Sequence, residues 1–292
     1  MMTLKQAFRE HGISFGMAVG AGNVNHELVR EHCEILVPEN AMKMAFFEPQ
    51  ENVWATGEMD AIMGAAHNQG MNVHGHCLYW GIVPDWLEPR LKVVNQSWRV
   101  GFLREYIQTV LGRYSGGAGI LHSVDVLNEC YNVELVWQKY GVMPEHALEY
   151  AAPYPVWRVY NMRTPNDPNY SWTEWRYAVQ LWCSGQIDGV GIQFHLDAGN
   201  LMPVKYAWHY LNEARAEGIP VRFSECGVAG SDQQQVNACW WELANLAVKF
   251  GDVVAEFVQW GVKDPAWRGA VTLFNEDGNP KPQFDAVIDA IS

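Results

Sequence analysis

The stretch "HSVDVLNE", residues 122–129, decides the fold: it begins as an apolar run and ends in an amide and a carboxylate. Branched residues such as Val124 and Val126 favour a buried β-strand. Asn128 and Glu129 follow where that strand is expected to end. Buried strands that present polar groups at their carboxyl ends are typical of parallel α/β proteins. Seven further segments of the chain are also short apolar runs, and most of them end in polar residues.

Apolar segments alternate with longer segments of helical spacing along the whole chain. Because this alternation fills 292 residues without a linker, the sequence predicts an α/β fold, a (β/α)8 TIM barrel that forms a single domain over residues 1–292. An open doubly wound sheet would alternate too, but "VGAGNVNH" (19–26) lacks the glycine spacing of a dinucleotide loop. The predicted strands are 13–19, 33–39, 71–80, 122–129, 156–161, 189–196, 220–225 and 256–262, and the predicted helices are 57–70, 97–114, 144–152, 174–185, 204–218 and 234–250.

Polar side chains stand at the ends of most predicted strands. In a barrel these ends form one rim, which carries the catalytic groups in characterised enzymes of this fold. One such residue alone is readily explained as solvated or capping, but a series at successive strand ends favours a functional site. The series comprises Glu39, Asn40, His76, Asn128, Glu129, Asn161, Gln193, His195, Glu225 and Trp260.

Two carboxylates in this series, Glu129 and Glu225, follow the fourth and seventh predicted strands. They can therefore face each other across the barrel mouth. Facing carboxylates are the basic apparatus of glycosidic hydrolysis, in which one donates a proton and the other attacks or activates water. Each glutamate alone is explained equally well as a rim residue or an ion-pair partner. Their shared strand-end position favours the chemical interpretation.

The composition limits the class of partner. A count of 33 acidic against 20 basic residues, a net charge of −13, disfavours nucleic acids and anionic membranes. Neutral polysaccharides remain compatible, and among the 14 Trp residues we assign three or four to a sugar-binding cleft. We expect a polysaccharide or oligosaccharide substrate, no nucleic-acid or membrane partner, and a monomer.

Cysteine spacing and the N-terminus bear on cofactors and location. The six cysteines are widely scattered, which favours free thiols. "HGHC" (74–77) has no second ligand pair at zinc-type spacing, so no metal is expected there. The first 20 residues carry charges where a signal peptide has its apolar core, and no run reaches the ~20 apolar residues of a membrane span. We expect a soluble chain without a signal peptide, although a secreted enzyme that has lost its leader would have the same sequence. The cysteines are Cys33, Cys77, Cys130, Cys183, Cys226 and Cys239.

The rim segments also resemble a known family, the endo-β-1,4-xylanases of glycoside hydrolase family 10. "VPENAMKM" (37–44) is similar to the family's "ENxMK", "GHCLYW" (75–80) to "GHTLVW", and "VDVLNEC" (124–130) to "WDVVNEA". "DGVGIQFHL" (188–196) is similar to "DGVGxQxHL", "FSECGV" (223–228) to "TELDV", and "WGVKDPAW" (260–267) to "WGxxDxxSW". The segments occur in family order and cover nearly the whole chain.

The resemblance implies a (β/α)8 barrel that cleaves β-1,4-xylosidic bonds in xylan by retaining double displacement, acting within the chain. Glu129 then matches the general acid/base and Glu225 the nucleophile. Asn128 matches the residue that binds the sugar 2-hydroxyl, and His195 the residue that contacts the nucleophile. This mechanism requires no organic cofactor and no catalytic metal, so none is expected. The residues expected to bind substrate are Glu39, Asn40, Lys43, His76, Trp80, Asn161, Gln193, Trp260 and Trp267.

The chain departs from the family pattern at five places, one of which is the loop "DPAW" (264–267), a residue shorter than the family's. Val124 replaces a Trp, Gly227 replaces the Asp two residues after the nucleophile, "GIVP" (81–84) replaces the longer "HSQLP", and "NMR" (161–163) replaces "NDY". These changes leave three alternatives open: a barrel with shifted specificity for another β-linked glycan or glycoside, a non-catalytic carbohydrate-binding barrel, and a different retaining barrel glycosidase. The "ENxMK" and "GVGxQxHL" similarities argue against the last.

Overall fold

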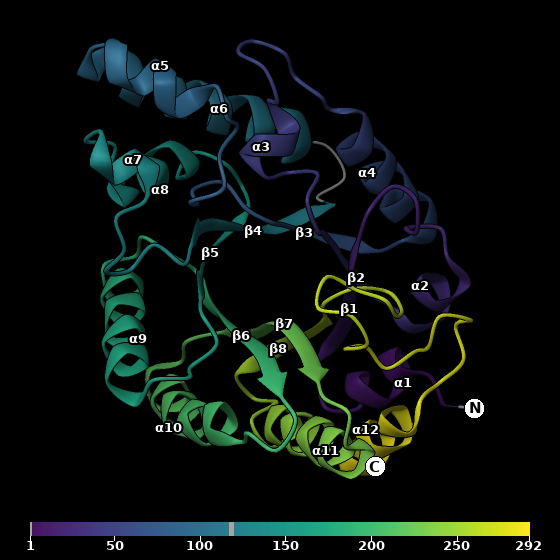
Figure 1. The fold of residues 1–292 in the computed structure, drawn as a ribbon. Helices are drawn as coiled ribbons and strands as arrows, with labels where there is room; N and C mark the ends of the chain where they lie inside the picture. Colours follow the sequence, from purple (N-terminus) through teal and green to yellow (C-terminus); the bar gives the residue numbers. More distant parts are fainter. Residues whose placement is uncertain (1, 117–119) are drawn as a thin grey trace.

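Eight parallel strands close into a barrel in the computed structural model, which describes residues 2–116 and 120–292 (Figure 1). Each strand pairs with the next along the chain, and the first pairs with the last. The predicted (β/α)8 TIM barrel is therefore confirmed, and all eight predicted strands overlap observed ones. The strands are β1 (Ser14–Val19), β2 (Ile35–Pro38), β3 (Asn72–Gly75), β4 (Leu121–Asn128), β5 (Trp157–Met162), β6 (Gly189–Asp197), β7 (Val221–Ala229) and β8 (Val254–Gln259).

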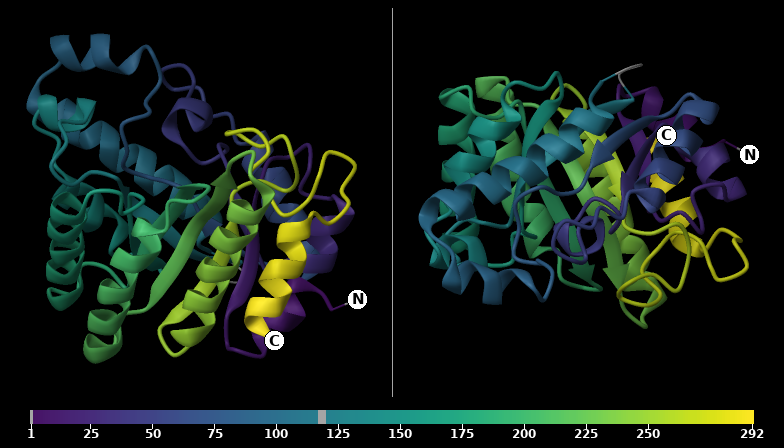
Figure 2. Two further views of the ribbon diagram at one scale, coloured as in Figure 1. Left: turned by 60° about the horizontal axis from the view of Figure 1, so that its bottom comes forward. Right: turned by 90° about the horizontal axis from the view of Figure 1, so that it is seen from above.

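Helices surround the barrel on its outside (Figures 1 and 2). All six predicted helices are observed, and residues 2–116 and 120–292 contain six further helices, most of them short, that the sequence did not predict. Two helices end at glycines with left-handed φ, Gly70 at 63° and Gly218 at 72°, which suits glycine because it lacks a Cβ. The helices are α1 (Leu4–Arg9), α2 (Glu27–His32), α3 (Met44–Phe47), α4 (Gly57–Gln69), α5 (Leu87–Val93), α6 (Gln96–Tyr114), α7 (Val136–Lys139), α8 (Pro144–Ala151), α9 (Pro168–Cys183), α10 (Met202–Glu217), α11 (Gln233–Lys249) and α12 (Pro282–Ile291).

Three phenylalanine rings pack where the barrel closes between β1 and β8. Phe8 on α1 stacks on Phe257 of β8 at a centroid distance of 4.8 Å and on Phe15 of β1 at 5.6 Å. All three side chains are fully buried. Burial of one such ring contributes about 2 kcal/mol, so this cluster stabilises the junction of the first and last strands.

The barrel interior contains a buried charged network beneath the rim. Asp125 on β4 lies between two histidines of β3, with Oδ1 3.0 Å from His74 Nε2 and Oδ2 2.8 Å from His76 Nδ1. Arg222 on β7 approaches Asp125 Oδ1 to 3.9 Å and pairs with Glu256 on β8. Burial alone would raise the pKa of Asp125, but the two histidines hold it well below its usual range. The histidines of "HGHC" are thus partners of a carboxylate, and no cluster of metal-ligand type occurs within residues 2–116 and 120–292.

The cysteine side chains and the apolar character of the helices bear on redox state and membrane association. All six cysteines are free, as predicted, and only Cys183 is exposed. None of the helices in the described part of the chain is long and apolar enough to cross a membrane.

Candidate active site

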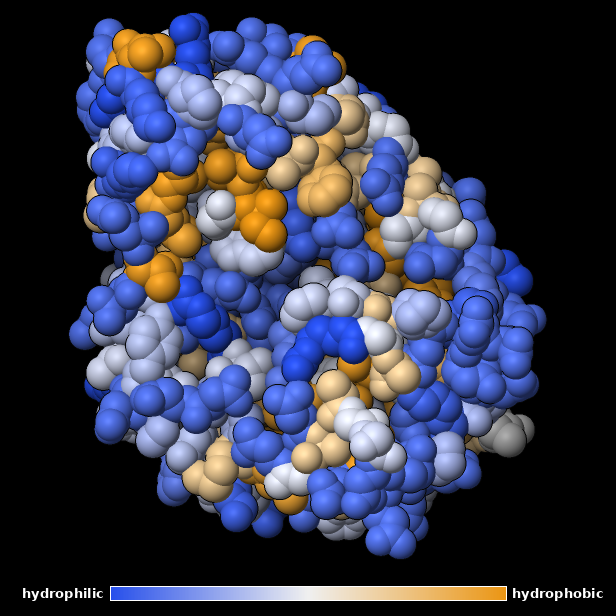
Figure 3. All heavy atoms as spheres, in the orientation of Figure 1, coloured by the Kyte–Doolittle hydropathy of each residue, from blue (hydrophilic) through white to orange (hydrophobic). Residues whose placement is uncertain are grey.

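A cavity of about 370 Å³ opens at the carboxyl ends of the strands. Figure 3 looks onto this face and shows the hollow near its centre, with polar residues deep inside and apolar residues on part of its edge. Strands and loops from most of the barrel contribute to its wall, and all lining residues except Ile82 were predicted from the sequence. The lining residues are Lys43, His76, Trp80, Ile82, Asn128, Glu129, Gln193, His195, Glu225, Trp260 and Trp267.

Glu225 presents its carboxylate to this cavity from β7. His195 on β6 places Nε2 3.0 Å from Glu225 Oε2, and Asn161 on β5 donates to Oε1 at 2.8 Å. Burial alone would raise the pKa of this carboxyl, but the His195 hydrogen bond and the nearby His76 lower it by more, so the pKa lies below its usual value. Glu225 is therefore ionised at neutral pH, as a carboxylate nucleophile must be.

Glu129 enters the cavity from the end of β4 through an unusual backbone conformation. Its φ is 50°, a left-handed value that few residues other than glycine adopt. Its N–H donates to the Asn161 carbonyl at 2.9 Å. Its carboxylate accepts from Trp80 Nε1 at 3.2 Å and from Gln193 Nε2 at 2.6 Å. Strained conformations of this kind persist only where surrounding contacts hold them, and they are concentrated at functional sites.

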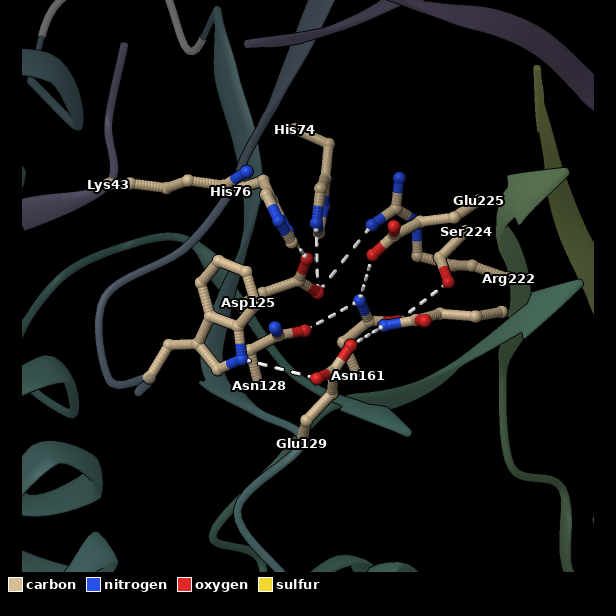
Figure 4. Close-up of polar contacts among 12 residues, drawn as sticks. Lys43, His74, His76, Asp125, Asn128, Glu129, Asn161, Arg222, Ser224 and Glu225 are labelled. Carbon is tan, nitrogen blue, oxygen red and sulfur yellow. Dashed lines mark hydrogen bonds and ion pairs between the residues drawn. The ribbon is translucent and has the colours of Figure 1, made fainter. Parts of the chain in front are cut away.

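Asn161 is buried next to the cavity and links Asn128, which precedes Glu129 at the end of β4, to Glu225 on β7. Its Nδ2 donates both to Asn128 Oδ1 and to Glu225 Oε1 at 2.8 Å, while its Oδ1 accepts from Ser224 at 2.6 Å (Figure 4). The side chain is fully buried and does not line the cavity. Its amide is therefore committed to protein partners, whereas the sequence predicted a substrate contact. The structure instead suits Asn161 to positioning Asn128 and Glu225.

Aromatic residues form the wall of the cavity next to Lys43. The Lys43 ammonium lies 5.0 Å from the Trp80 ring centre and 6.0 Å from that of Trp260, and it donates to Asn40 at 3.1 Å. Trp260 is almost fully buried, whereas Trp267 is 57% exposed and packs edge-on against His195. Three tryptophans thus line the cavity, within the predicted three or four. Glu39 and Asn40 are half-buried and are not among the lining residues.

Two departures from the family pattern are accommodated by apolar packing. Gly227 pairs in register with His195, and a Cβ added there would meet Val271 at 3.5 Å, an ordinary contact. Val271 thus borders the place where the family has an acidic residue. Val124 is fully buried, and its methyl group lies only 3.1 Å from where a Cβ on Gly75 would be. Val124 therefore packs closely against the backbone of β3 at Gly75.

Sequence reasoning missed two kinds of residue at the site. Ile82 is 47% exposed and presents an apolar side chain to the cavity. The signal for Ile82 was the shortened segment 81–84. Arg163 lies behind Glu129 and donates to the Glu129 carbonyl. Its signal was the change at the end of "NMR", but the sequence did not indicate which group the new side chain would contact.

The geometry supports acid/base chemistry on a neutral, ring-shaped substrate. Two carboxylates from different strands reach one cavity, and each has its own set of hydrogen-bond donors. Aromatic side chains beside them offer faces for the C–H surface of a sugar ring. A carboxylate pair in such a cavity is the arrangement that glycosidic bond cleavage requires.

Comparisons with known proteins identify the family and the fold. The sequence model described as "Glycosyl hydrolase family 10" matches residues 3–143 and 160–290. "Endo-1,4-beta-xylanase 3" of Hypocrea jecorina is 25% identical over 306 residues, which cover 96% of this chain and 83% of that protein. "Beta-1,4-xylanase" of Dictyoglomus thermophilum is 25% identical over 331 residues, 98% of this chain and 90% of that protein. The solved structure of xylanase B from Clostridium stercorarium F9 is 25% identical with a TM-score of 0.86, covering 99% of this chain and 100% of that chain.

Proposed function

The chain belongs to glycosyl hydrolase family 10, and on this premise we propose that it is a retaining endo-β-1,4-xylanase whose barrel is one catalytic domain. The observation that carries the proposal is the pair of carboxylates in one cavity. Glu225 is held by His195 and Asn161, and Glu129 is held by Trp80 and Gln193. The relatives described as xylanases support xylan as the substrate.

The first step of the proposed reaction forms a covalent intermediate. Glu225 attacks the anomeric carbon of the xylosyl unit, and the glycosidic C–O bond breaks as Glu129 gives its proton to the leaving oxygen. The aglycone leaves with the protonated oxygen as its new non-reducing end, and the glycone, which will carry the new reducing end, remains bound to Glu225 as an ester. Glu129 is then a carboxylate.

The second step restores the enzyme. Glu129 accepts a proton from a water molecule, whose oxygen attacks the anomeric carbon and displaces Glu225. Two inversions at one carbon give net retention. In this scheme Asn128, which is held by Asn161, binds the 2-hydroxyl of the reacting sugar. Lys43, His76, Gln193 and the three tryptophans Trp80, Trp260 and Trp267 surround the sugar rings.

A second candidate, a shifted specificity within the same reaction type, is favoured by Ile82. This exposed apolar side chain lines the cavity in the segment where the family sequence has polar residues. An apolar group cannot donate a hydrogen bond to a sugar hydroxyl, so xylan is expected to lose contacts there. Another β-linked glycan or a glycoside with an apolar substituent would lose less.

A product profile tests the proposed function. The purified protein is incubated with xylan, mixed-linkage β-glucan and short aryl β-glycosides, and reducing ends and product lengths are measured. We expect a series of short xylo-oligosaccharides from xylan, formed with retention at the anomeric carbon. Preferential cleavage of the glucan would favour shifted specificity. No release from any β-linked substrate would refute the enzyme and leave the binding-only barrel.

The contact between His195 and Glu225 predicts a pH effect. Because this hydrogen bond lowers the pKa of Glu225, His195→Ala is expected to raise that pKa. Glu225 must be ionised to attack, so the acid limb of the kcat/KM profile should move to higher pH, while the maximum rate also falls. His195→Gln, which retains a donor nitrogen, should shift the limb less. An acid limb at the wild-type position in His195→Ala would contradict this role.

A further inference from the structure

The segment that follows β4 is anchored from outside the cavity. Beyond Glu129 the chain continues through buried Cys130 to Tyr131. The guanidinium of Arg163, one residue past the end of β5, donates to the carbonyl oxygens of both Glu129 and Tyr131. The carbonyls on either side of Cys130 are therefore held by one side chain.

Arg163 is in turn fixed by α9, which lies beside β5 in Figure 1. Its guanidinium donates to the hydroxyl of Tyr170, which itself donates to the Tyr131 carbonyl. Its Nη1 lies 3.6 Å from Glu174 Oε1, and the Glu174 side chain is only 1% exposed. Glu174 Oε1 also accepts from the Tyr160 hydroxyl at 2.7 Å. Arg163 thus links the Glu129 segment to a buried carboxylate.

The hydrogen-bond donors of the Arg163 guanidinium are used by protein partners. Both Nη atoms are directed to carbonyls of the catalytic segment, to Tyr170 and toward Glu174. The side chain is 28% exposed and is not among the residues that line the cavity. A planar guanidinium is suited to holding several acceptors in fixed directions, which an ammonium cannot reproduce. The geometry therefore suits Arg163 to fixing backbone rather than binding sugar.

We infer that Arg163 is a positioning residue for the acid/base step: by holding the Glu129 and Tyr131 carbonyls it maintains the backbone conformation that directs the Glu129 carboxyl at the glycosidic oxygen. This inference rests on the proposed function. Glu129 has a left-handed φ of 50°, which is unfavourable for a residue with a Cβ. Without the guanidinium the segment can relax toward an ordinary conformation, and the carboxyl then leaves its place beside Trp80 and Gln193.

The charge of Glu174 adds an electrostatic effect of Arg163 on the surroundings of Glu129. Burial raises the pKa of Glu174 to about 7 even though the Tyr160 hydrogen bond and the Arg163 cation both act to lower it. The Arg163 guanidinium contacts both this carboxyl and the backbone carbonyl of Glu129. The negative charge of the Glu129 side chain repels that of Glu174. Removal of the cation therefore changes both the backbone and the electrostatic surroundings of the acid/base residue. Both changes act on Glu129 and leave the contacts of Glu225 with His195 and Asn161 in place.

The test uses Arg163→Met, which keeps a long side chain and removes the donors. Proton donation matters for poor leaving groups and hardly at all for activated ones. For a dinitrophenyl β-xylobioside we expect kcat/KM within about threefold of the wild type. For phenyl β-xylobioside and xylotetraose we expect kcat/KM to fall roughly 10- to 100-fold. Arg163→Lys should show a smaller loss of the same pattern.

Arg158→Met is the matched control because Arg158 lies on β5, the strand that Arg163 follows, and pairs with Asp188 at 2.9 Å. It stands at the opposite end of β5, so its loss should change no dependence on the leaving group. Equal losses on all substrates in Arg163→Met, or no loss, would overturn the inference. If Arg163→Met does not fold, as judged by circular dichroism, a wild-type leaving-group dependence in Arg163→Lys overturns it. A wild type that cleaves none of the substrates would instead refute the proposed function.

Discussion

Glu225→Ala is expected to abolish turnover on every substrate, with kcat lowered by roughly 10⁵-fold or more, because the nucleophile is lost and the remaining carboxylate, Glu129, serves as the acid/base. The loss should not depend on the leaving group, since even an activated aryl glycoside needs the nucleophile. Reducing-sugar release from xylan and chromophore release from a dinitrophenyl β-xylobioside measure it. Glu225→Gln, which keeps the side-chain shape, should be equally inactive and should unfold at a temperature close to that of the wild type.

The stereochemistry of rescue tests this assignment further. Alanine at position 225 leaves room on the face of the sugar from which the carboxylate would attack. Azide can occupy that space and attack an activated substrate once, which gives an α-glycosyl azide by single inversion. An α-azide product, identified by proton NMR, is the expected result. Substantial xylan cleavage by Glu225→Ala would show that another residue is the nucleophile.

Glu129→Ala has the second-largest expected effect, and this effect should depend on the leaving group. Cleavage of xylan and of other substrates with poor leaving groups should fall roughly 10²- to 10⁴-fold, because the departing oxygen receives no proton. A dinitrophenyl glycoside leaves without protonation, so formation of the intermediate should remain fast. The second step then lacks its general base, and the intermediate should accumulate in a burst.

Azide should rescue Glu129→Ala with the opposite stereochemistry to that in Glu225→Ala. The anion attacks the intermediate on Glu225 from the side where water normally enters, which gives a β-glycosyl azide. The two variants therefore serve as controls for each other. Wild-type rates on natural xylan in Glu129→Ala, or an α-azide from it, would refute the acid/base assignment.

The sequence predicted the barrel because its strands are short apolar runs that end in polar residues. In "HSVDVLNE" the apolar positions indicate burial, and the following Asn128 and Glu129 indicate the rim. The same pattern located most residues of the cavity wall. Helices such as α3 and α7 escaped prediction because four residues carry too little periodicity to distinguish a turn of helix from a loop.

The contacts of individual side chains could not be predicted in the same way. Asn161 was expected to touch substrate, but its direction depends on the position of Ser224 on β7 and Asn128 on β4, both distant in sequence. The role of Arg163 depends on α9 supplying Tyr170 and Glu174 beside it. Such contacts follow from how strands and helices pack, whereas the sequence pattern reports only which residues share a face.

The distribution of the site around the barrel has a consequence for its integrity. His76 follows β3, while Glu129, His195, Glu225 and Trp260 stand on or just beyond β4, β6, β7 and β8. No single strand–helix unit contains enough of these groups to perform the reaction. The active site therefore exists only in the closed barrel. Separating any two neighbouring strands would move its residues apart even if every strand–helix unit kept its local structure. Catalytic activity therefore reports whether the strands are paired in a closed barrel.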